Sequence, residues 1–321
     1  MTVELKNLKK ELLFYYESRQ NPNGDPGFEN QPRLMPDGTI LVTDVRVKRT
    51  IRDYAKNKFN ETLFVDYGED GTPVTADKRA KEIVKKGEII TGLLKETFDT
   101  PLFGALVTIR SKGSGKEEGS ARKITGPVQF GIGRSVNQVQ ILNPMITGRF
   151  VGKAKKEGEE QFSTFGKFYA VEYALIKIQG VVNPVNLGQY LEDKEIMKKY
   201  TDAESKLFEC LWNGTNSLVS RSKFPQRSIF FLEVSYDGAM YNDLPLLVEE
   251  DPAVKGKISA LPNSPLKFEK LLEALKARRK LIVNVRVAAC HELHPDVDGL
   301  VAKLQKENMS AELIRPEEIR P

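Results

Sequence analysis

The sequence has 321 residues, of which 40% are hydrophobic and 29% charged, and its formal net charge of +5 is only a weak indication of an anionic partner. Apolar residues this frequent exclude a disordered chain, and the absence of any run of about 18 uncharged apolar residues excludes a transmembrane helix. No signal peptide is expected, and the 2 cysteines fit a reduced, cytoplasmic compartment better than a disulfide framework.

The N-terminal part predicts a strand, a long loop and a helix. Residues 3–18 follow the two-residue period of a strand, and the turn-forming residues Asn21–Pro26 open a loop that continues to about Gly38. Thr43 is a plausible N-cap for the helix that follows. The buried face of this helix is predicted from four residues with helical spacing, Val47, Ile51, Tyr54 and Ala55.

The middle of the chain predicts an insertion followed by a protruding hairpin. Residues 60–125 contain two predicted helices, at 76–86 and around 92–98, and a Gly/Ser/Lys-rich stretch at 110–123. Strand-like order returns between 125 and 150. The highly polar residues 151–160 then indicate a hairpin with a charged tip.

The rest of the chain mixes strands and helices, and the helices are too sparse for a regular βαβ array. The sequence therefore predicts the α+β class, with a sheet on one side and helices on the other. A capping box, Thr201 to Glu204, predicts the start of one helix. The expected elements are strands at 168–182, 228–236 and 281–288, helices at 201–220, 268–278 and 300–308, and a short final strand.

The predicted helix after Thr43 carries a basic face. Its cations fall within a stripe about 100° wide, opposite Val47 and Ile51. Asp53 is the only acid among them, so the like charges are expected to repel unless a polyanion relieves the repulsion. A solvated helix face is the alternative interpretation. The stripe consists of Lys48, Arg49, Arg52 and Lys56.

Two further segments are candidates for binding. The loop that opens at Asn21 is longer than a typical connection of about 4–6 residues, and long loops are often functional. Ser220–Arg227 is a second basic cluster, which places Arg221, Lys223 and Arg227 at a predicted helix C-terminus. Cations there also complement the helix dipole, so a structural role and a binding role both stay open.

Three blocks of the sequence, in order over roughly half the chain, resemble one family. The first joins the initial strand, Asn21–Pro26, the Pro32-Arg33 step and residues 42–54. The others are Asp99–Ala105 and Thr125–Ser135. Together they resemble the Cas-seven family, the crRNA-binding backbone subunit of type I CRISPR Cascade complexes, and are most similar to its I-B and I-C branch.

The resemblance implies a single discontinuous domain with three parts. The palm would have an RRM-like (ferredoxin-like) fold built from residues of about 1–59, 125–144 and 168–321. A finger insertion would occupy about 60–124, and a thumb hairpin about 145–167.

The resemblance also implies a function. The chain would be a non-catalytic subunit of a CRISPR antiviral surveillance complex that oligomerises as a helical filament along the spacer region of crRNA. It would present that RNA for pairing with target DNA. Its partners would be crRNA, target DNA by way of the guide, other copies of itself, and the Cas-five, large and small Cascade subunits. No membrane, cofactor, metal or catalytic residue is expected.

Carried over to this sequence, the resemblance assigns RNA-binding residues. The assignment agrees with physical expectation, because a protein that must bind guides of any sequence needs contacts to the RNA backbone rather than to base edges. The thumb wedge is left open among Met145, Ile146 and Phe150. Glycines at 126, 131 and 133 allow either a close approach to RNA or β-bulges. With the second basic cluster included, the RNA-binding candidates are Asn21, Asn23, Arg33, Lys48, Arg49, Arg52, Gln129, Arg134, Arg221 and Lys223.

Two alternatives remain open at the level of sequence. An RRM-like CRISPR endoribonuclease would process guide RNA or cut target RNA with an acidic loop residue and a metal, and Asp25 and Asp44 are the nearest candidates. A metabolic enzyme would need a pocket with perturbed acids, which the sequence does not reveal. His291 and His294, beside Cys290, indicate a surface turn rather than a metal site, because no second ligand cluster accompanies them.

Overall fold

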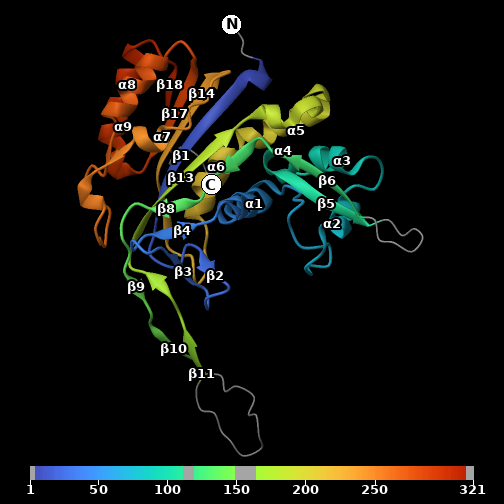
Figure 1. Cartoon of the computed structure of the whole chain (residues 1–321), viewed down its shortest axis with the longest axis horizontal. Coiled ribbons are helices and arrows are strands. Elements are labelled where there is room, and N and C mark those ends of the chain that lie inside the picture. Colours follow the sequence, from blue (N-terminus) through green and yellow to red (C-terminus); the bar gives the residue numbers. More distant parts are fainter. Residues whose placement is uncertain (1–3, 111–118, 149–163, 316–321) are drawn as a thin grey trace, which may run out of the picture.

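The computed structural model describes residues 4–110, 119–148 and 164–315, and its main feature is a 10-stranded sheet (Figure 1). Nine strands follow one another across the sheet, and the tenth, β7 (Val128–Phe130), pairs with β13. The order is β18 (Ala311–Ile314), β17 (Ile282–Ala289), β14 (Gln226–Asp237), β1 (Leu8–Ser18), β13 (Ala174–Val182), β8 (Gly133–Ser135), β4 (Ile40–Val42), β3 (Gln31–Leu34) and β2 (Gly24–Asp25).

Strand β1 lies near the middle of the sheet and is antiparallel to both of its neighbours. Leu13 stands opposite Gln179 on β13 and Leu232 on β14. From β1 the chain passes through α1 (Asp44–Phe59) to β7 and β8, which both pair with β13 in the antiparallel sense. From β13 it passes through two helices to β14. The α+β class predicted from the sequence is confirmed.

Apolar cores lie on both faces of the sheet. In β1, Leu12, Phe14 and Tyr16 belong to a core on the first face, whereas Leu13 and Tyr15 belong to a core on the second face. Helices α1, α5 (Lys194–Ser205) and α6 (Leu207–Asn216) contribute to the first core, and α8 (Glu269–Arg278) and α9 (His294–Lys306) to the second. The prediction of helices on one side only is therefore wrong, because β1 and β14 have buried side chains on both faces.

The predicted insertion contains more regular structure than the sequence indicated. Helix α2 (Ala76–Ile83) and helix α3 (Ile89–Glu96) are close to their predicted positions. Two elements that were not predicted follow, α4 (Asp99–Phe103) and an antiparallel hairpin of β5 (Gly104–Arg110) and β6 (Gly119–Thr125). The hairpin is closed tightly at Gly104, where an added Cβ would meet the carbonyl oxygen of Ile124 at 2.3 Å.

The predicted protruding hairpin is present. Strands β9 (Ile141–Leu142) and β12 (Ala170–Val171) pair at its base, and β10 (Met145–Gly148) and β11 (Thr164–Lys167) pair further out. The hairpin extends away from the main sheet (Figure 1). Met145 and Ile146 therefore lie in β10, whereas Phe150 falls outside the residues that the structure describes.

Two helix starts differ from the predictions. Helix α5 begins at Lys194 rather than Thr201, because Asp193 caps it by accepting hydrogen bonds from the backbone N–H groups of Glu195 (2.9 Å) and Ile196 (3.4 Å). Helix α9 begins at His294 rather than Leu300. None of the helices in the described ranges is long and apolar enough to cross a membrane. The remaining short elements are Leu5–Asn7, Pro184–Glu192, α7 (Leu244–Leu247), β15 (Glu249–Glu250), Pro252–Val254, β16 (Leu266–Lys267) and His291–Leu293.

Candidate nucleic-acid interface

Two loops and the base of the hairpin meet at one end of the sheet. The N–H of Asn21 donates to the carbonyl of Ser222 (2.9 Å), which joins the loop after β1 to the loop before β14. The N–H of Val171, in the hairpin base, donates to the carbonyl of Gln20 (3.2 Å). Segments far apart in the sequence therefore share one surface, from which the hairpin emerges (Figure 1).

This surface contains two partly buried cations, Arg46 on α1 and Lys223 in the loop before β14. The Nζ of Lys223 donates to the carbonyl of Asn21 (2.6 Å), and the Nη2 of Arg46 donates to the hydroxyl of Thr50 (2.9 Å). In the part of the chain that the structure describes, no carboxylate lies within 4.0 Å of either cation. Burial and the neighbouring guanidinium of Arg46 lower the pKa of Lys223 to about 8. Because the two cations lie near each other and no described carboxylate is within ion-pair distance of either, an entering phosphate would stabilise both.

The basic stripe of α1 differs from the prediction, because all four of its cations are compensated. Four ion pairs involve them, and two of the acids come from the inserted region. The prediction of nearly uncompensated charge is therefore wrong. The pairs are Lys48–Asp44 (3.2 Å), Arg49–Asp53 (2.5 Å), Arg52–Asp99 (2.7 Å) and Lys56–Asp66 (2.5 Å).

Arg52 in particular lies in the interior. Its side chain is 10% exposed, and that of Asp99 is 1% exposed. The other contacts of Asp99 are with the backbone, since its carboxylate also accepts hydrogen bonds from the N–H groups of Phe64 (2.7 Å) and Val65 (3.1 Å). The guanidinium of Arg52 lies 5.0 Å from the ring centre of Phe103. This geometry gives Arg52 a role in fixing α1 to the insertion, and leaves little of it free to contact a phosphate.

Lys48 and Gln129 lie together beside the start of α1. The Nζ of Lys48 donates to the Oε1 of Gln129 (3.1 Å), and the Nε2 of Gln129 donates to the carbonyl of Gly126 (2.9 Å). Lys48 is 9% exposed. Arg134 points elsewhere: it is exposed, donates from Nε to the hydroxyl of Thr39 (2.8 Å) and pairs with Asp37.

The candidate residues of the first loop hold that loop together. Asn21 is buried and donates to the carbonyl of Asn30, and Arg33 pairs with Asp25 (3.1 Å). Asn23 contacts the start of α1: its Oδ1 accepts from the N–H (2.7 Å) and the hydroxyl (2.9 Å) of Thr43. Thr43 is the N-cap as predicted, although its own side chain does not cap the helix.

The second basic cluster divides between two environments. The guanidinium of Arg221 lies 5.6 Å from the ring centre of Phe168, beside β11. Arg227 forms ion pairs with Glu17 (2.9 Å) and Glu292 (2.6 Å). Of this cluster, Arg221 and Lys223 therefore lie at the hairpin end of the sheet without a carboxylate contact among the described residues.

Arg46 was not a candidate in the sequence analysis. It neighbours the buried Val47 on α1. Its proximity to Lys223 arises only because a loop far along the chain folds back beside α1. The only signal was its position within the block that resembles the family.

Replacing Asn23 with alanine is expected to lower the free energy of unfolding by about 1 kcal/mol, because the start of α1 loses two hydrogen bonds. Urea denaturation measures this loss. Asn57→Ala, at an exposed position on the same helix, is the matched control. A loss of RNA affinity with unchanged stability would instead identify Asn23 as a direct RNA contact.

The low pKa of Lys223 predicts a pH-dependent affinity for polyanions. Above about pH 8 the free protein holds a neutral amine, so binding that requires the cation must take up a proton. Affinity is expected to fall by up to about tenfold per pH unit above that value. Fluorescence anisotropy with a labelled RNA between pH 7 and 9.5 tests this, and Lys223→Arg is expected to abolish the dependence. An equal decline in the arginine variant would rule out Lys223 as its origin.

The same shift affects folding in the opposite direction. Because the pKa of Lys223 is depressed in the folded chain, the folded state loses its proton before the unfolded state does as the pH rises from about 8 toward the normal lysine value. The unfavourable burial of the cation is thereby relieved. The free energy of unfolding attributable to Lys223 therefore rises with pH across that interval.

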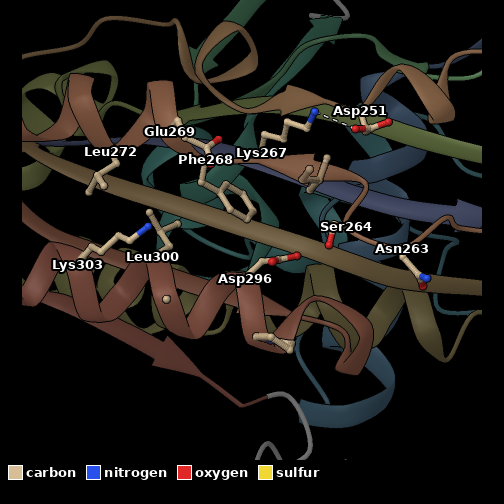
Figure 2. Close-up of a pocket in the computed structure, with 13 residues that line it drawn as sticks. Asp251, Asn263, Ser264, Lys267, Phe268, Glu269, Leu272, Asp296, Leu300 and Lys303 are labelled. Carbon is tan, nitrogen blue, oxygen red and sulfur yellow. Dashed lines mark ion pairs between the residues drawn. The ribbon is translucent and has the colours of Figure 1, made fainter.

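A separate cleft of about 500 Å³ lies between α8 and α9 (Figure 2). Phe268, Leu272 and Leu300 contribute apolar surface, and the charged side chains around it have mixed sign. Lys267 and Asp251 pair with each other at 2.9 Å. Nothing in this arrangement brings an acid, a base and a nucleophile together.

The residues weighed for other chemistry are engaged structurally. Asp25 pairs with Arg33, and Asp44 with Lys48. Burial raises the pKa of the Cys290 thiol to about 12, which disfavours the thiolate that metals bind. Within the described ranges, no group of three or more His, Cys, Asp or Glu side chains is arranged to hold a metal ion.

Comparison with known proteins gives consistent results. A family model described as "CRISPR-associated protein Cas7" matches residues 8–262. A Haloferax volcanii protein named "CRISPR-associated protein Cas7" is 26% identical over 325 residues, covering 90% of this chain and 89% of that protein. A chain from a structure titled "CRISPR RNA-guided surveillance complex, pre-nicking" superposes with a TM-score of 0.52 at 13% identity, covering 97% of this chain and 98% of that one.

Proposed function

The chain belongs to the Cas7 (Cas-seven) family of CRISPR-associated proteins, and on that premise we propose that it is a non-catalytic backbone subunit of a CRISPR antiviral surveillance complex. In this proposal it oligomerises along the spacer region of crRNA, binds that RNA, and presents it for pairing with target DNA. Its further partners are other copies of itself and the Cas-five, large and small subunits.

One observation carries the RNA-binding part of the proposal. Arg46 and Lys223 are partly buried and lie beside the first loop and the hairpin base, and neither has a carboxylate contact among the described residues. A guide RNA varies in sequence, so the protein must bind its sugar–phosphate backbone. Two neighbouring cations suit the binding of a phosphate backbone.

The strand order supports an RRM-like palm. The order β14-β1-β13, followed by β7 and β8, combines antiparallel neighbours with two helical crossovers, one through α1 and one through α5 and α6, and these helices contribute to the same first-face core. A βαββαβ connection of this kind is the ferredoxin-like arrangement. In the proposal the finger is the insertion at about 60–124 and the thumb is the hairpin at about 145–167.

Within this proposal the candidate residues have different roles. Arg46, Lys223, Arg221 and Arg49 are the phosphate contacts. The side chain of Arg49 is 36% exposed despite its pair with Asp53, so it remains accessible to RNA. A further set positions the loop and helix that carry these contacts: Asn21, Asn23, Arg33, Lys48, Arg52 and Gln129. The thumb wedge is one of Met145, Ile146 and Phe150.

Binding to RNAs of increasing length tests the proposal. Native mass spectrometry of the purified chain with single-stranded RNAs of unrelated sequence is expected to show bound copies increasing stepwise with RNA length. Affinities for RNAs of equal length are expected to agree within about threefold. One bound copy regardless of length would contradict the filament. Regularly spaced cuts in a complementary target RNA with Mg²⁺ would favour the endoribonuclease instead.

A further inference from the structure

A second cationic surface lies at the same end of the sheet, on its other face. It consists of Arg19, which follows β1, and of Lys255 and Lys257 in the loop between Val254 and Ile258. We call these three residues the second-face ridge. All three are exposed, and none has an ion pair within the described parts of the chain. Gly256, between the two lysines, faces open space.

The ridge and the Arg46–Lys223 pair are separated by the sheet. The guanidinium of Arg19 lies 5.2 Å from the ring centre of Tyr173, a residue of the second-face core. Arg46, in contrast, lines a small crevice with Phe14 and Tyr16, which belong to the first-face core. Cations thus flank the end of β1 on both faces.

The backbone of the ridge is anchored. The side chain of Val254 is fully buried, and Ile258 packs against the second-face core. The carbonyl of Lys255 accepts from the N–H of Gln138 (3.2 Å), just before the hairpin base, and the carbonyl of Ser259 accepts from the Nη1 of Arg19 (2.7 Å). Because the loop is held at both ends, Lys255 and Lys257 are presented outward at a small entropic cost.

We propose that the second-face ridge is a second binding site for a nucleic-acid sugar–phosphate backbone, distinct from the Arg46–Lys223 site. Three exposed cations on an anchored backbone, beside the same hairpin base, suit a partner that carries several phosphates, because each neutralised phosphate releases counterions. The inference rests on the proposed function. The chemistry fits either a further stretch of the guide or the strand paired with it, and the two arms of the experiment separate these sources.

The test uses the full chain with Lys255→Glu and Lys257→Glu combined. One arm measures the affinity for guide RNA, and the other measures the affinity of the RNA-loaded assembly for complementary single-stranded DNA, both by anisotropy at several salt concentrations. A matched control combines Lys303→Glu and Lys306→Glu, two exposed lysines on α9 with the same change of charge. Circular dichroism confirms folding of both variants.

We expect affinity to fall at least about tenfold in one arm relative to the control, with a shallower salt dependence corresponding to about two phosphate contacts. A loss confined to the DNA arm assigns the ridge to the paired strand, and a loss in the guide arm assigns it to the guide. If both arms stay within about twofold of the control variant, the second site does not exist. Failure of the proposed function gives a different result, namely an affinity for guide RNA that is unchanged when Arg46 and Lys223 are replaced.

Discussion

Combining Arg46→Gln with Lys223→Gln is expected to weaken guide RNA binding at least about 100-fold at physiological salt. Each cation contributes a charge-assisted contact of about 1.5–3 kcal/mol to a phosphate, and about 1.4 kcal/mol corresponds to a factor of ten. Glutamine keeps a donor for Asn21 and Thr50, so the local hydrogen bonds can persist. The affinity is measured by anisotropy with guides of several sequences.

The loss is expected to be the same for every guide sequence, because phosphate contacts carry no sequence information. The slope of the logarithm of affinity against the logarithm of salt concentration should decrease by the amount expected for the loss of about two phosphate contacts. Combining Lys303→Gln with Lys306→Gln removes the same charge from exposed positions on α9 and serves as the control. If both double variants bind RNA equally well, Arg46 and Lys223 do not contact the RNA.

Arg52→Met is expected to lower the free energy of unfolding by about 3–5 kcal/mol. The substitution removes the cation from Asp99, whose side chain is 1% exposed and cannot regain water without opening the structure. Urea denaturation measures the effect. Lys81→Met, which breaks the exposed pair with Asp77, is the control and is expected to cost less than about 1 kcal/mol.

A double variant separates the effect of the uncompensated charge on Asp99 from the loss of the other Arg52 contacts. Adding Asp99→Asn to Arg52→Met removes the uncompensated carboxylate but keeps an acceptor for the N–H groups of Phe64 and Val65. Part of the lost stability is therefore expected to return. RNA affinity per folded molecule should change little in either variant. A stable Arg52→Met protein with weakened RNA binding would restore Arg52 to the phosphate contacts.

Local periodicity predicted the elements that dominate the fold. Helix α1 and strand β14 were placed within a few residues, and β1 was predicted correctly apart from its start, which lies at Leu8 rather than at residue 3. The layering was wrong because Leu12–Tyr16 is an unbroken run of buried residues. A run of this kind cannot be divided between faces until the strand's neighbours are known, and α8 and α9 cover the second face from far along the chain.

The candidate site was predictable to a smaller extent, because accessibility of a cation depends on acids that the fold brings to it. The stripe on α1 has one acid within it, yet Asp66 and Asp99 approach from the insertion and compensate Lys56 and Arg52. Arg46, beside the buried Val47, has no such partner in the described part of the chain. Lys223 was a candidate on charge alone. That it lies beside Arg46 could be seen only in the tertiary structure.

The two margins of the main sheet have a consequence for self-association. Strand β2 has 2 residues and is followed by Pro26, and β18 has 4 residues and is followed in the sequence by Arg315 and then Pro316. Proline lacks the N–H that a new ladder would need, and strands this short give an incoming chain little to pair with. Polymerisation by strand addition is therefore disfavoured, and under the proposed function this leaves the nucleic acid as the template that would set polymer length.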